Sequence, residues 1–107
     1  MLKFLRNILL LPLFFAGAAV SADRSFDQAS FDTLQKQKKP ILVEIHADWC
    51  PTCKAQEPII AELLKTPEFQ SISALRVDFD KQKNIVKALK AQYQSTLIVF
   101  RNGNEVG

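Results

Sequence analysis

The hydrophobic residues of this 107-residue chain form one continuous run near the start and a series of short periodic segments after it. From Ile8 to Val20 nearly every residue is apolar and none is charged. Beyond residue 22, apolar positions recur with the period of a helix or of a strand. Helical and strand segments alternate along this part of the chain, which predicts an α/β architecture of packed layers.

Three apolar segments predict strands. Ile41–Ile45 is a mostly β-branched run, so we expect a strand that is buried on both faces. Leu75–Phe79 alternates apolar with charged residues, and Thr96–Phe100 predicts a third strand. Asn102-Gly103 is a residue pair typical of a two-residue hairpin turn, so a fourth strand should begin at Glu105.

Helical spacing predicts one helix before the first of these strands and two between the strands. A short helix around Phe31 should end before Pro40. Cys53–Leu64 has apolar residues at helical spacing, and Pro58 within this segment should kink the helix. Asn84–Ala91 carries its apolar residues on one face, which predicts a third helix.

The first 22 residues have the residue order of a secretory signal peptide. Lys3 and Arg6 form a short basic region, the apolar run follows, and Val20-Ser21-Ala22 supplies compact residues before polar sequence begins. The run is shorter than the roughly 20 apolar residues that span a membrane. We therefore expect residues 1–22 to be removed after export and the domain to occupy residues 23–107. An uncleaved N-terminal anchor, which would place the chain at a membrane, is the alternative.

The charge of the chain gives no reason to expect binding to nucleic acid. The net charge is +3, and removal of the signal segment would leave +1. The remaining lysines are scattered, and no basic stripe carries interleaved aromatic residues. The charged fraction of 23% and the hydrophobic fraction of 48% fit a soluble globular domain.

The segment that carries chemistry is Trp49-Cys50-Pro51-Thr52-Cys53-Lys54, between a predicted buried strand and a predicted helix. Unpaired N–H groups and the dipole at a helix N-terminus stabilise a thiolate. We therefore expect the Cys50 thiol to point outward, with a pKa below the usual value of about 8.5. Cys53 lies one turn into the helix, where it can attack a mixed disulfide on Cys50 and release the product. The segment predicts thiol–disulfide exchange, with Cys50 as the attacking thiol and Cys53 as the resolving thiol.

Two other interpretations of the cysteine pair stay open on the residues alone. A zinc site needs four ligands, and the chain offers two cysteines and one histidine, His46, so carboxylates would have to complete it. A structural disulfide suits an exported protein, but so small a ring constrains little of the unfolded chain. His46, at the end of a strand, is either a packing residue or a group that tunes the site.

The segment Ile41–Lys54 resembles the active-site strand, loop and helix of the thioredoxin family. Pro58 matches the proline that kinks the family's active-site helix, and Ser95–Phe100 with Asn102-Gly103 resembles a later loop, strand and hairpin. The resemblance covers residues 26–107. It implies an α/β fold with three layers and a mixed central sheet. The family's sheet is completed by one more full strand and a C-terminal helix, so we expect this domain to be incomplete at its C-terminal end.

The resemblance also implies roles for residues around the cysteines. Glu44 occupies the position of an acidic residue below the resolving cysteine, where it would accept the proton of Cys53. Arg76 falls on the neighbouring strand, where the family often has a basic partner. Trp49 would shield the site and form part of the substrate surface. The alternatives are that Glu44 is a surface acid and that Trp49 is a core aromatic residue.

The expected substrate-docking surface consists of Trp49, Pro51, Thr52, Ser95 and Thr96. Ser95 stands where the family has a cis-proline. A cis bond before a residue other than proline costs about 2.5–4 kcal/mol, so we predict a trans peptide bond before Ser95. If the loop can return to the family geometry, Ser95→Pro should tighten substrate capture.

We expect the chain to be a thiol–disulfide oxidoreductase that exchanges the Cys50–Cys53 dithiol or disulfide with protein substrates. The signal segment predicts the periplasm or another extracytoplasmic space. No cofactor and no bound metal are implied, and another thiol protein would donate or accept the electrons. The likeness of Ala47–Cys50 to thioredoxin-like modules of bacterial envelope reductases favours the reductase direction. A non-catalytic binding module and a carrier of a soft metal ion are the alternatives.

Overall fold

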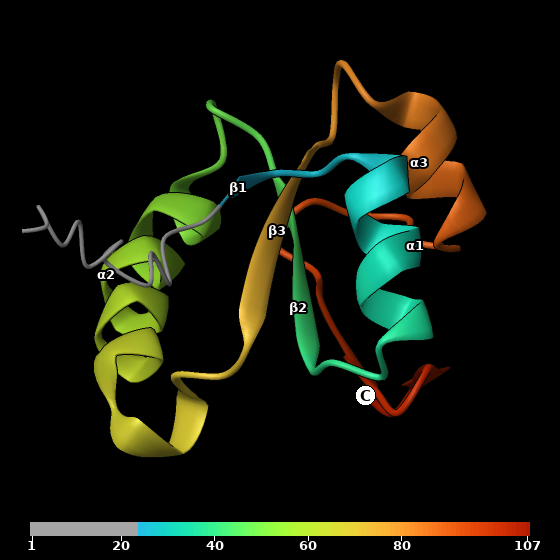
Figure 1. Cartoon of the computed structure of the whole chain (residues 1–107). Coiled ribbons are helices and arrows are strands. Elements are labelled where there is room, and N and C mark those ends of the chain that lie inside the picture. Colours follow the sequence, from blue (N-terminus) through green and yellow to red (C-terminus); the bar gives the residue numbers. More distant parts are fainter. Residues whose placement is uncertain (1–23) are drawn as a thin grey trace, which may run out of the picture.

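The computed structural model describes residues 24–107 as a five-stranded sheet with helices on both faces (Figure 1). The predicted signal segment, residues 1–22, lies outside the described residues. The strands are β1 (Arg24–Ser25), β2 (Ile41–His46), β3 (Ser73–Asp78), β4 (Leu97–Arg101) and β5 (Asn104–Glu105). Their order across the sheet is β1-β3-β2-β4-β5. The strands β1, β3 and β2 run parallel, whereas β4 and β5 pair antiparallel with their neighbours. The predicted α/β class and mixed sheet are confirmed.

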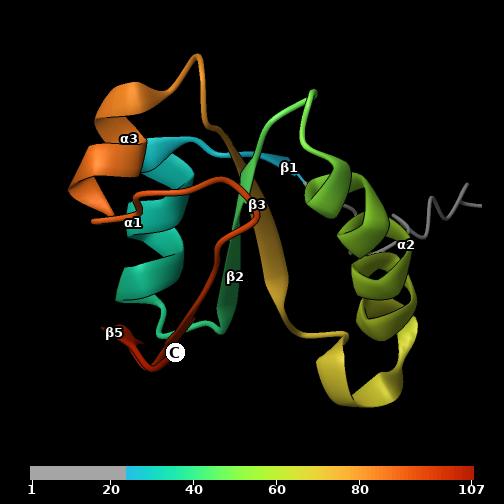
Figure 2. The same ribbon diagram turned by 180° about the vertical axis from the view of Figure 1, so that it is seen from behind.

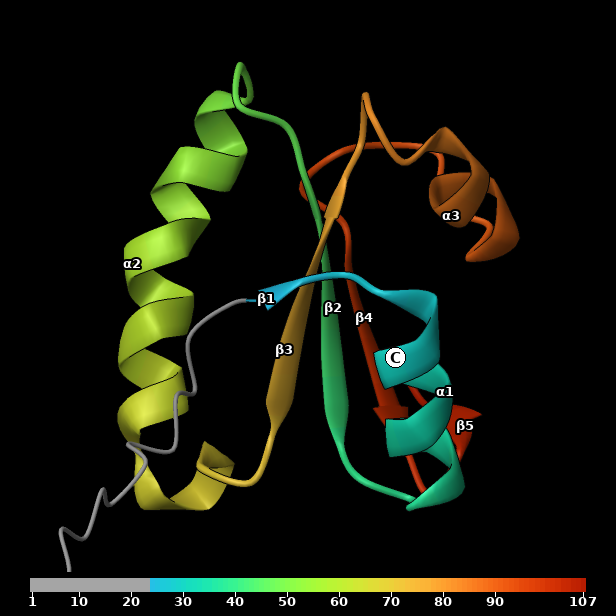
Figure 3. The same cartoon turned by 45° about the horizontal axis from the view of Figure 1, so that its top comes forward.

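The helices form two layers that enclose the sheet. They are α1 (Gln28–Lys36), α2 (Pro51–Lys65), the short 3-10 helix η1 (Pro67–Phe69) and α3 (Lys83–Ala88). In Figure 3, α2 lies on one side of the strands, and α1 and α3 lie on the other. The predicted three-layer arrangement is therefore confirmed.

The two faces of the central strands carry different side chains, because successive residues of a strand point to opposite faces. The side facing α1 and α3 holds the main apolar core, formed by Phe26, Phe31, Ile41, Val43, Ile45, Leu75, Val77, Val86, Ile98 and Phe100. On the side facing α2, Ile60 and Leu64 pack against Ala74 and Leu42. The same α2 side of β2 also carries Glu44 and His46, both buried.

Local sequence accounts for most element boundaries. The Asp27 side chain accepts a hydrogen bond from the Ser30 N–H and so caps α1. Asn102 and Gly103 both have positive φ, as a tight hairpin turn between β4 and β5 requires. Viewed from behind, this hairpin lies beside one end of α1 (Figure 2), and a Cβ on Gly103 would lie 3.7 Å from the Gln35 carbonyl oxygen.

The boundaries differ from the sequence predictions at several ends. The strand β1 was not predicted, since two residues show no periodicity. The helix α3 ends at Ala88 rather than Ala91, and Lys90 adopts a positive φ. The fourth predicted strand, β5, begins one residue before Glu105 and is two residues long. No helix follows β5 in the described part of the chain.

Candidate functional site

The cysteine pair lies where the end of β2 passes into the start of α2. Both cysteines are free thiols, and they pack with Ala47 and the partly buried Phe79. Cys50 is the N-cap residue of α2, and its sulfur accepts a 3.0 Å hydrogen bond from the Cys53 N–H. Pro51 occupies the first helical position, where the missing N–H of proline costs nothing. The short loop and the proline thus place both sulfurs at the helix N-terminus.

The expectation that the Cys50 thiol points outward is wrong. Cys50 is only 1% exposed, because its sulfur folds back over the first turn of α2 to cap the Cys53 N–H. Pro51 and Thr52, between the two cysteines, are exposed. The outward surface of the motif is therefore formed by its intervening residues.

The Cys53 thiol is held in its protonated form by its surroundings. Burial raises the pKa of Cys53 above its ordinary value, and the neighbouring Cys50 side chain raises it further. The backbone groups of Ala47 and Ser95 act in the opposite direction without reversing the shift. The Cys53 sulfur lies 3.8 Å from the Ile45 carbonyl oxygen. A base that takes the Cys53 proton is therefore needed before this sulfur can attack a disulfide.

Trp49 lies on the surface beside the cysteines rather than in the core. Its side chain is 56% exposed, and its indole N–H donates a 2.7 Å hydrogen bond to the Asp80 carboxylate. The Trp49 ring also meets Phe79 edge to face, with 6.4 Å between the ring centroids. Asp80 and Phe79 follow β3, so this contact joins segments that are far apart in sequence. The indole is thereby fixed as a wall of the site that is open to solvent.

The loop that contains Ser95 is hydrogen-bonded to β2. The Ser95 N–H donates to the Ile45 carbonyl at 2.7 Å, and the Ile45 N–H donates to the Thr96 carbonyl at 2.9 Å. The Gln56 side chain on α2 donates to the Ser95 carbonyl at 3.2 Å, and the Thr96 hydroxyl donates to the Tyr93 carbonyl at 2.7 Å. The structure therefore brings Ser95, whose backbone acts on the Cys53 thiol, to the cysteine pair, and Thr96 follows it in the same loop.

The peptide bond before Ser95 is trans, as predicted, but the φ angle of Ser95 does not suit the proline of the predicted Ser95→Pro variant. No cis peptide bond occurs among residues 24–107, which confirms the predicted trans bond between Gln94 and Ser95. Ser95 has a φ of 60°, a conformation that residues with a side chain rarely adopt. Proline fixes φ near −65° and has no N–H, so Ser95→Pro would also lose the bond to Ile45. In this geometry the substitution should not improve substrate capture.

Glu44 is in the interior, as the family resemblance implied. The residue is 5% exposed on the α2 side of β2, directly before Ile45, whose carbonyl approaches the Cys53 sulfur. Glu44 is the register partner of Arg76 on β3, so the two side chains leave neighbouring strands on the same face. The alternative of an exposed surface acid is excluded by this burial. The structure leaves the proposed proton transfer between Glu44 and Cys53 as a prediction.

Sequence reasoning missed Glu57, which contacts two strands from α2. Its Oε1 atom lies 3.3 Å from an Arg76 guanidinium nitrogen and 3.6 Å from His46 Nδ1. The other ring nitrogen of His46 lies 3.1 Å from the Asp48 carboxylate. A helical signal was present in the sequence, because a residue four positions after Cys53 lies on the same helix face. Glu57 was overlooked because its partners are on other elements.

Two further observations on the described residues concern metal binding and membrane-crossing helices. Within residues 24–107, no three or more side chains of His, Cys, Asp or Glu gather closely enough to hold a metal ion. None of the helices in this range has the length and apolar character needed to cross a bilayer.

Comparison with known sequences identifies a family over most of the chain. The sequence model of the family Thioredoxin matches residues 20–107. Thioredoxin Y2, chloroplastic, of Arabidopsis thaliana is 30% identical over 92 residues, which are 86% of this chain and 52% of that protein. Thioredoxin of Malassezia sympodialis is 27% identical over 77% of this chain and 76% of its own length. The chain spans about half to two thirds of the length of the first curated relatives it matches.

Comparison with solved structures supports the same fold. The crystal structure of Trxlp from Edwardsiella tarda EIB202 is 37% identical and superposes with a TM-score of 0.78, covering 80% of this chain and 84% of that one. Thioredoxin of Malassezia sympodialis superposes with a TM-score of 0.69 at 24% identity, covering 79% of this chain and 75% of that one.

Proposed function

The chain belongs to the thioredoxin family, and on that premise we propose that it exchanges disulfides with other proteins through Cys50 and Cys53. The observation that carries this proposal is the position of the two sulfurs. They lie at the N-terminus of α2, where the Cys53 N–H donates to the Cys50 sulfur, and Ser95 approaches from another loop. Both thiols are free and close enough in sequence to form a small disulfide ring.

The proposed reaction consists of two exchanges. In the reductase direction, the Cys50 thiolate attacks one sulfur of a substrate disulfide, and the other substrate sulfur leaves as a thiolate and takes up a proton. Cys53 then gives its proton to Glu44, and its sulfur attacks Cys50. The bond between Cys50 and the substrate breaks, and the substrate sulfur that Cys50 had attacked leaves as a thiolate, which takes up a proton from Glu44 or from solvent. The substrate disulfide gains two electrons, and the Cys50–Cys53 pair becomes a disulfide.

A second protein dithiol would reduce this disulfide before another cycle, because the oxidised pair must regain two electrons by the same kind of exchange. The reductase direction is part of the proposal, supported by the likeness of the motif to modules of envelope reductases. The same steps run in reverse if the partner is oxidising, since exchange is reversible. The proposed docking surface consists of the exposed residues Trp49, Pro51 and Thr52 together with the loop of Ser95 and Thr96.

An assay of disulfide reduction tests the proposed reaction. The full chain, supplied with a small dithiol, should reduce a disulfide-bonded peptide, and Cys50→Ser should lower the rate to the background of the dithiol. Cys53→Ser should accumulate a mixed disulfide between Cys50 and the peptide, visible by mass spectrometry, because the resolving thiol is absent. Equal activity of Cys50→Ser and the unchanged chain would refute the proposal.

We also propose that the protein is exported and acts in the periplasm or another extracytoplasmic space. The support is the basic, apolar and small-residue order of residues 1–22. N-terminal sequencing of the protein from an envelope fraction should begin at Asp23. Recovery of the whole product in the cytoplasm with Met1 in place would contradict export, and a membrane-bound product with Met1 would indicate an uncleaved anchor.

A further inference from the structure

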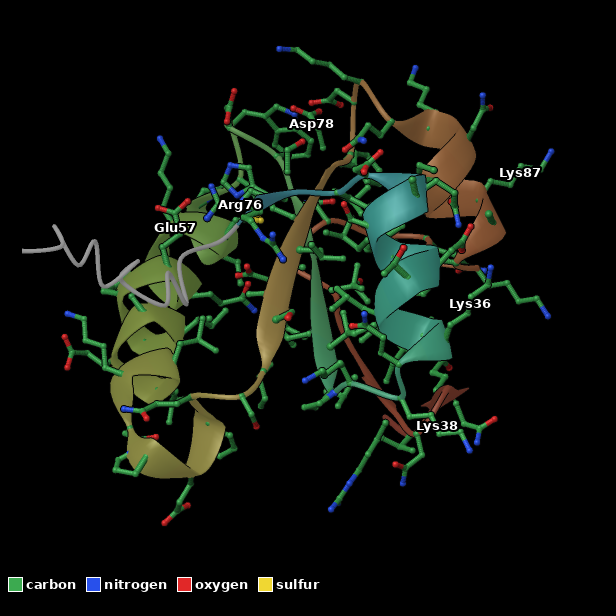
Figure 4. The ribbon with its side chains drawn as sticks, viewed as in Figure 1. Lys36, Lys38, Glu57, Arg76, Asp78 and Lys87 are labelled. Carbon is green, nitrogen blue, oxygen red and sulfur yellow. The ribbon has the colours of Figure 1, made fainter. Side chains whose placement is uncertain are left out.

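A bridge of polar side chains crosses from α2 to the central strands next to the cysteine pair. It consists of Glu57 on α2, Arg76 on β3, His46 on β2 and Asp48 in the loop before Cys50, and we call it the Glu57 bridge. Figure 4 shows Glu57 and Arg76 side by side near the start of α2. A single Glu57 oxygen contacts both Arg76 and His46, at 3.3 Å and 3.6 Å. The bridge therefore connects α2, β2 and β3 with the loop before Cys50.

Arg76, at one end of the Glu57 bridge, lies beside Glu44, the predicted proton acceptor. Arg76 is the register partner of Glu44, and neighbouring strands lie only about 4.8 Å apart. Arg76 therefore has one carboxylate residue beside it in the sheet, Glu44, and a second above it on the helix, Glu57. The two acids differ in surroundings, because Glu44 is buried and Glu57 is partly exposed.

This arrangement couples the charge of Glu57 to the chemistry of Glu44. A nearby cation favours the ionised form of a carboxyl group, and a second carboxylate on that cation offsets part of the effect. With Glu57 ionised, Arg76 acts less strongly on Glu44, which can then accept a proton more readily. If Glu57 were neutral, Arg76 would hold Glu44 more firmly as a carboxylate, which makes Glu44 a weaker base.

His46 gives the bridge a second connection. One ring nitrogen faces Glu57 and the other faces Asp48. A neutral imidazole donates a hydrogen bond from one nitrogen only, whereas the imidazolium donates from both. His46 therefore connects α2 to the loop that leads to Cys50.

We propose that Glu57 is a positioning residue which, through Arg76 and His46, sets how readily Glu44 takes the proton of Cys53 when a mixed disulfide is released. The inference rests on the proposed function and concerns only its second exchange. In that step the Cys53 proton moves to Glu44, the Cys53 sulfur bonds to the Cys50 sulfur, and the bond from Cys50 to the substrate breaks. The proton held on Glu44 returns to solvent or to the leaving sulfur.

Several other groups on the α2 side of the sheet contribute to the charge that Glu44 experiences. The titratable or charged groups there are His46, Asp48, Cys50, Cys53, Glu57, Arg76 and Asp78. The register neighbours from the flanking strands are uncharged, with Leu97 of β4 beside Glu44 and Ser25 of β1 beside Arg76. Of the two acids next to Arg76, only Glu57 can be replaced without removing the proposed proton acceptor.

The experiment compares Glu57→Gln with Glu62→Gln in the full chain. Both substitutions neutralise an acid on α2, but Glu62 is exposed and its carboxylate lies 3.5 Å from exposed Lys65, so it is the matched control. Formation and release of the mixed disulfide with a disulfide-bonded peptide are timed separately across the pH range in which carboxyl and thiol groups titrate. Glu57→Gln should slow release about three- to tenfold at neutral pH and leave formation within about twofold. The acid limb of the release profile should move to lower pH, because Arg76 then favours the Glu44 carboxylate more strongly.

Two further variants keep the inference falsifiable if Glu57→Gln folds poorly. Glu57→Asp keeps the charge and should restore the pH profile of release. Arg76→Met removes the cation and should move the acid limb in the opposite direction, to higher pH. Equal slowing of both steps, or a release profile identical to that of Glu62→Gln, would overturn the inference alone. A complete absence of exchange in the unchanged chain would overturn the proposed function and the inference together.

Discussion

The two faces of the central sheet differ in the side chains that cover them. The face toward α1 and α3 is covered by aliphatic and aromatic side chains, including Phe31, Val43 and Leu75, and its core residues carry no charge. The face toward α2 has a charged end with Glu44 and Arg76, close to the cysteine pair. Its other end is an apolar groove, lined by residues that include Leu42, Ile60, Leu63, Leu97 and Val99.

Apolar burial that stabilises the fold is concentrated on the face toward α1 and α3, and the candidate site lies on the face toward α2. Apolar burial is non-directional and stabilises the fold wherever area is removed from water, so one face can be devoted to it. Charged groups in the interior are costly unless they are paired, so they are confined to the end of the other face, where the cysteines lie.

The largest effect should be on the free energy of unfolding when a leucine is shortened to alanine on one face of the sheet or on the other. Leu75 is 1% exposed in the core, whereas Leu97 is 39% exposed on the α2 side. Leu75→Ala should lower the free energy of unfolding by about 2–5 kcal/mol, because it leaves a cavity among packed side chains. Leu97→Ala should cost less than about 1 kcal/mol, since much of that side chain already contacts water. Urea unfolding of both variants measures the difference, and similar losses would remove the contrast between the faces.

Glu44→Ala should separate chemistry from stability on the α2 side. Without Glu44, the proposed proton acceptor, Cys53 should attack the mixed disulfide roughly ten- to a hundredfold more slowly. Formation of the mixed disulfide should change little, because it does not require the Cys53 proton to move. Rapid-quench trapping of the intermediate distinguishes the two steps. Equal slowing of both would remove Glu44 from the mechanism.

The two thiols should differ in reactivity although both are buried. The raised pKa of Cys53 keeps its reactive thiolate scarce, and each pKa unit changes the thiolate fraction about tenfold. Alkylation of the reduced protein at neutral pH should therefore label Cys50 in preference to Cys53. Peptide mass mapping locates the label. Faster labelling of Cys53 would reverse the roles assigned to the two cysteines.

The smallest effect should appear at the start of α1, on the apolar side of the sheet. Hydrogen bonds from Ser30 lower the pKa of Asp27, so its carboxylate is favoured in the folded protein. This contribution to stability is present above the ordinary pKa of an aspartate and is lost as the pH falls through the lowered value. Asp27→Ala should lower the melting temperature slightly at neutral pH, and the difference should vanish in acid. A constant difference at every pH would mean that the capping carboxylate is not responsible.

Local sequence was sufficient to predict most helices and strands and the position of the cysteine pair. Strand β2 is marked by the apolar, mostly β-branched residues around Glu44, and the hairpin turn by Asn102-Gly103, so neighbouring residues alone specify both. The cysteine pair was placed at a helix start for the same reason. The two-residue β1 could not be predicted, because it is a strand only through its pairing with β3.

The placement of the cysteine pair between a strand and a helix follows from the period of apolar positions and the spacing of the cysteines, which are local properties of the chain. Tertiary packing sets how the side chains around the pair are arranged. It joined Trp49 to Asp80 and brought Glu57 to Arg76. These contacts depend on the register of β2 with β3 and on how α2 lies across them. Register and helix placement are set by packing over the whole sheet, so no short stretch of sequence contains them.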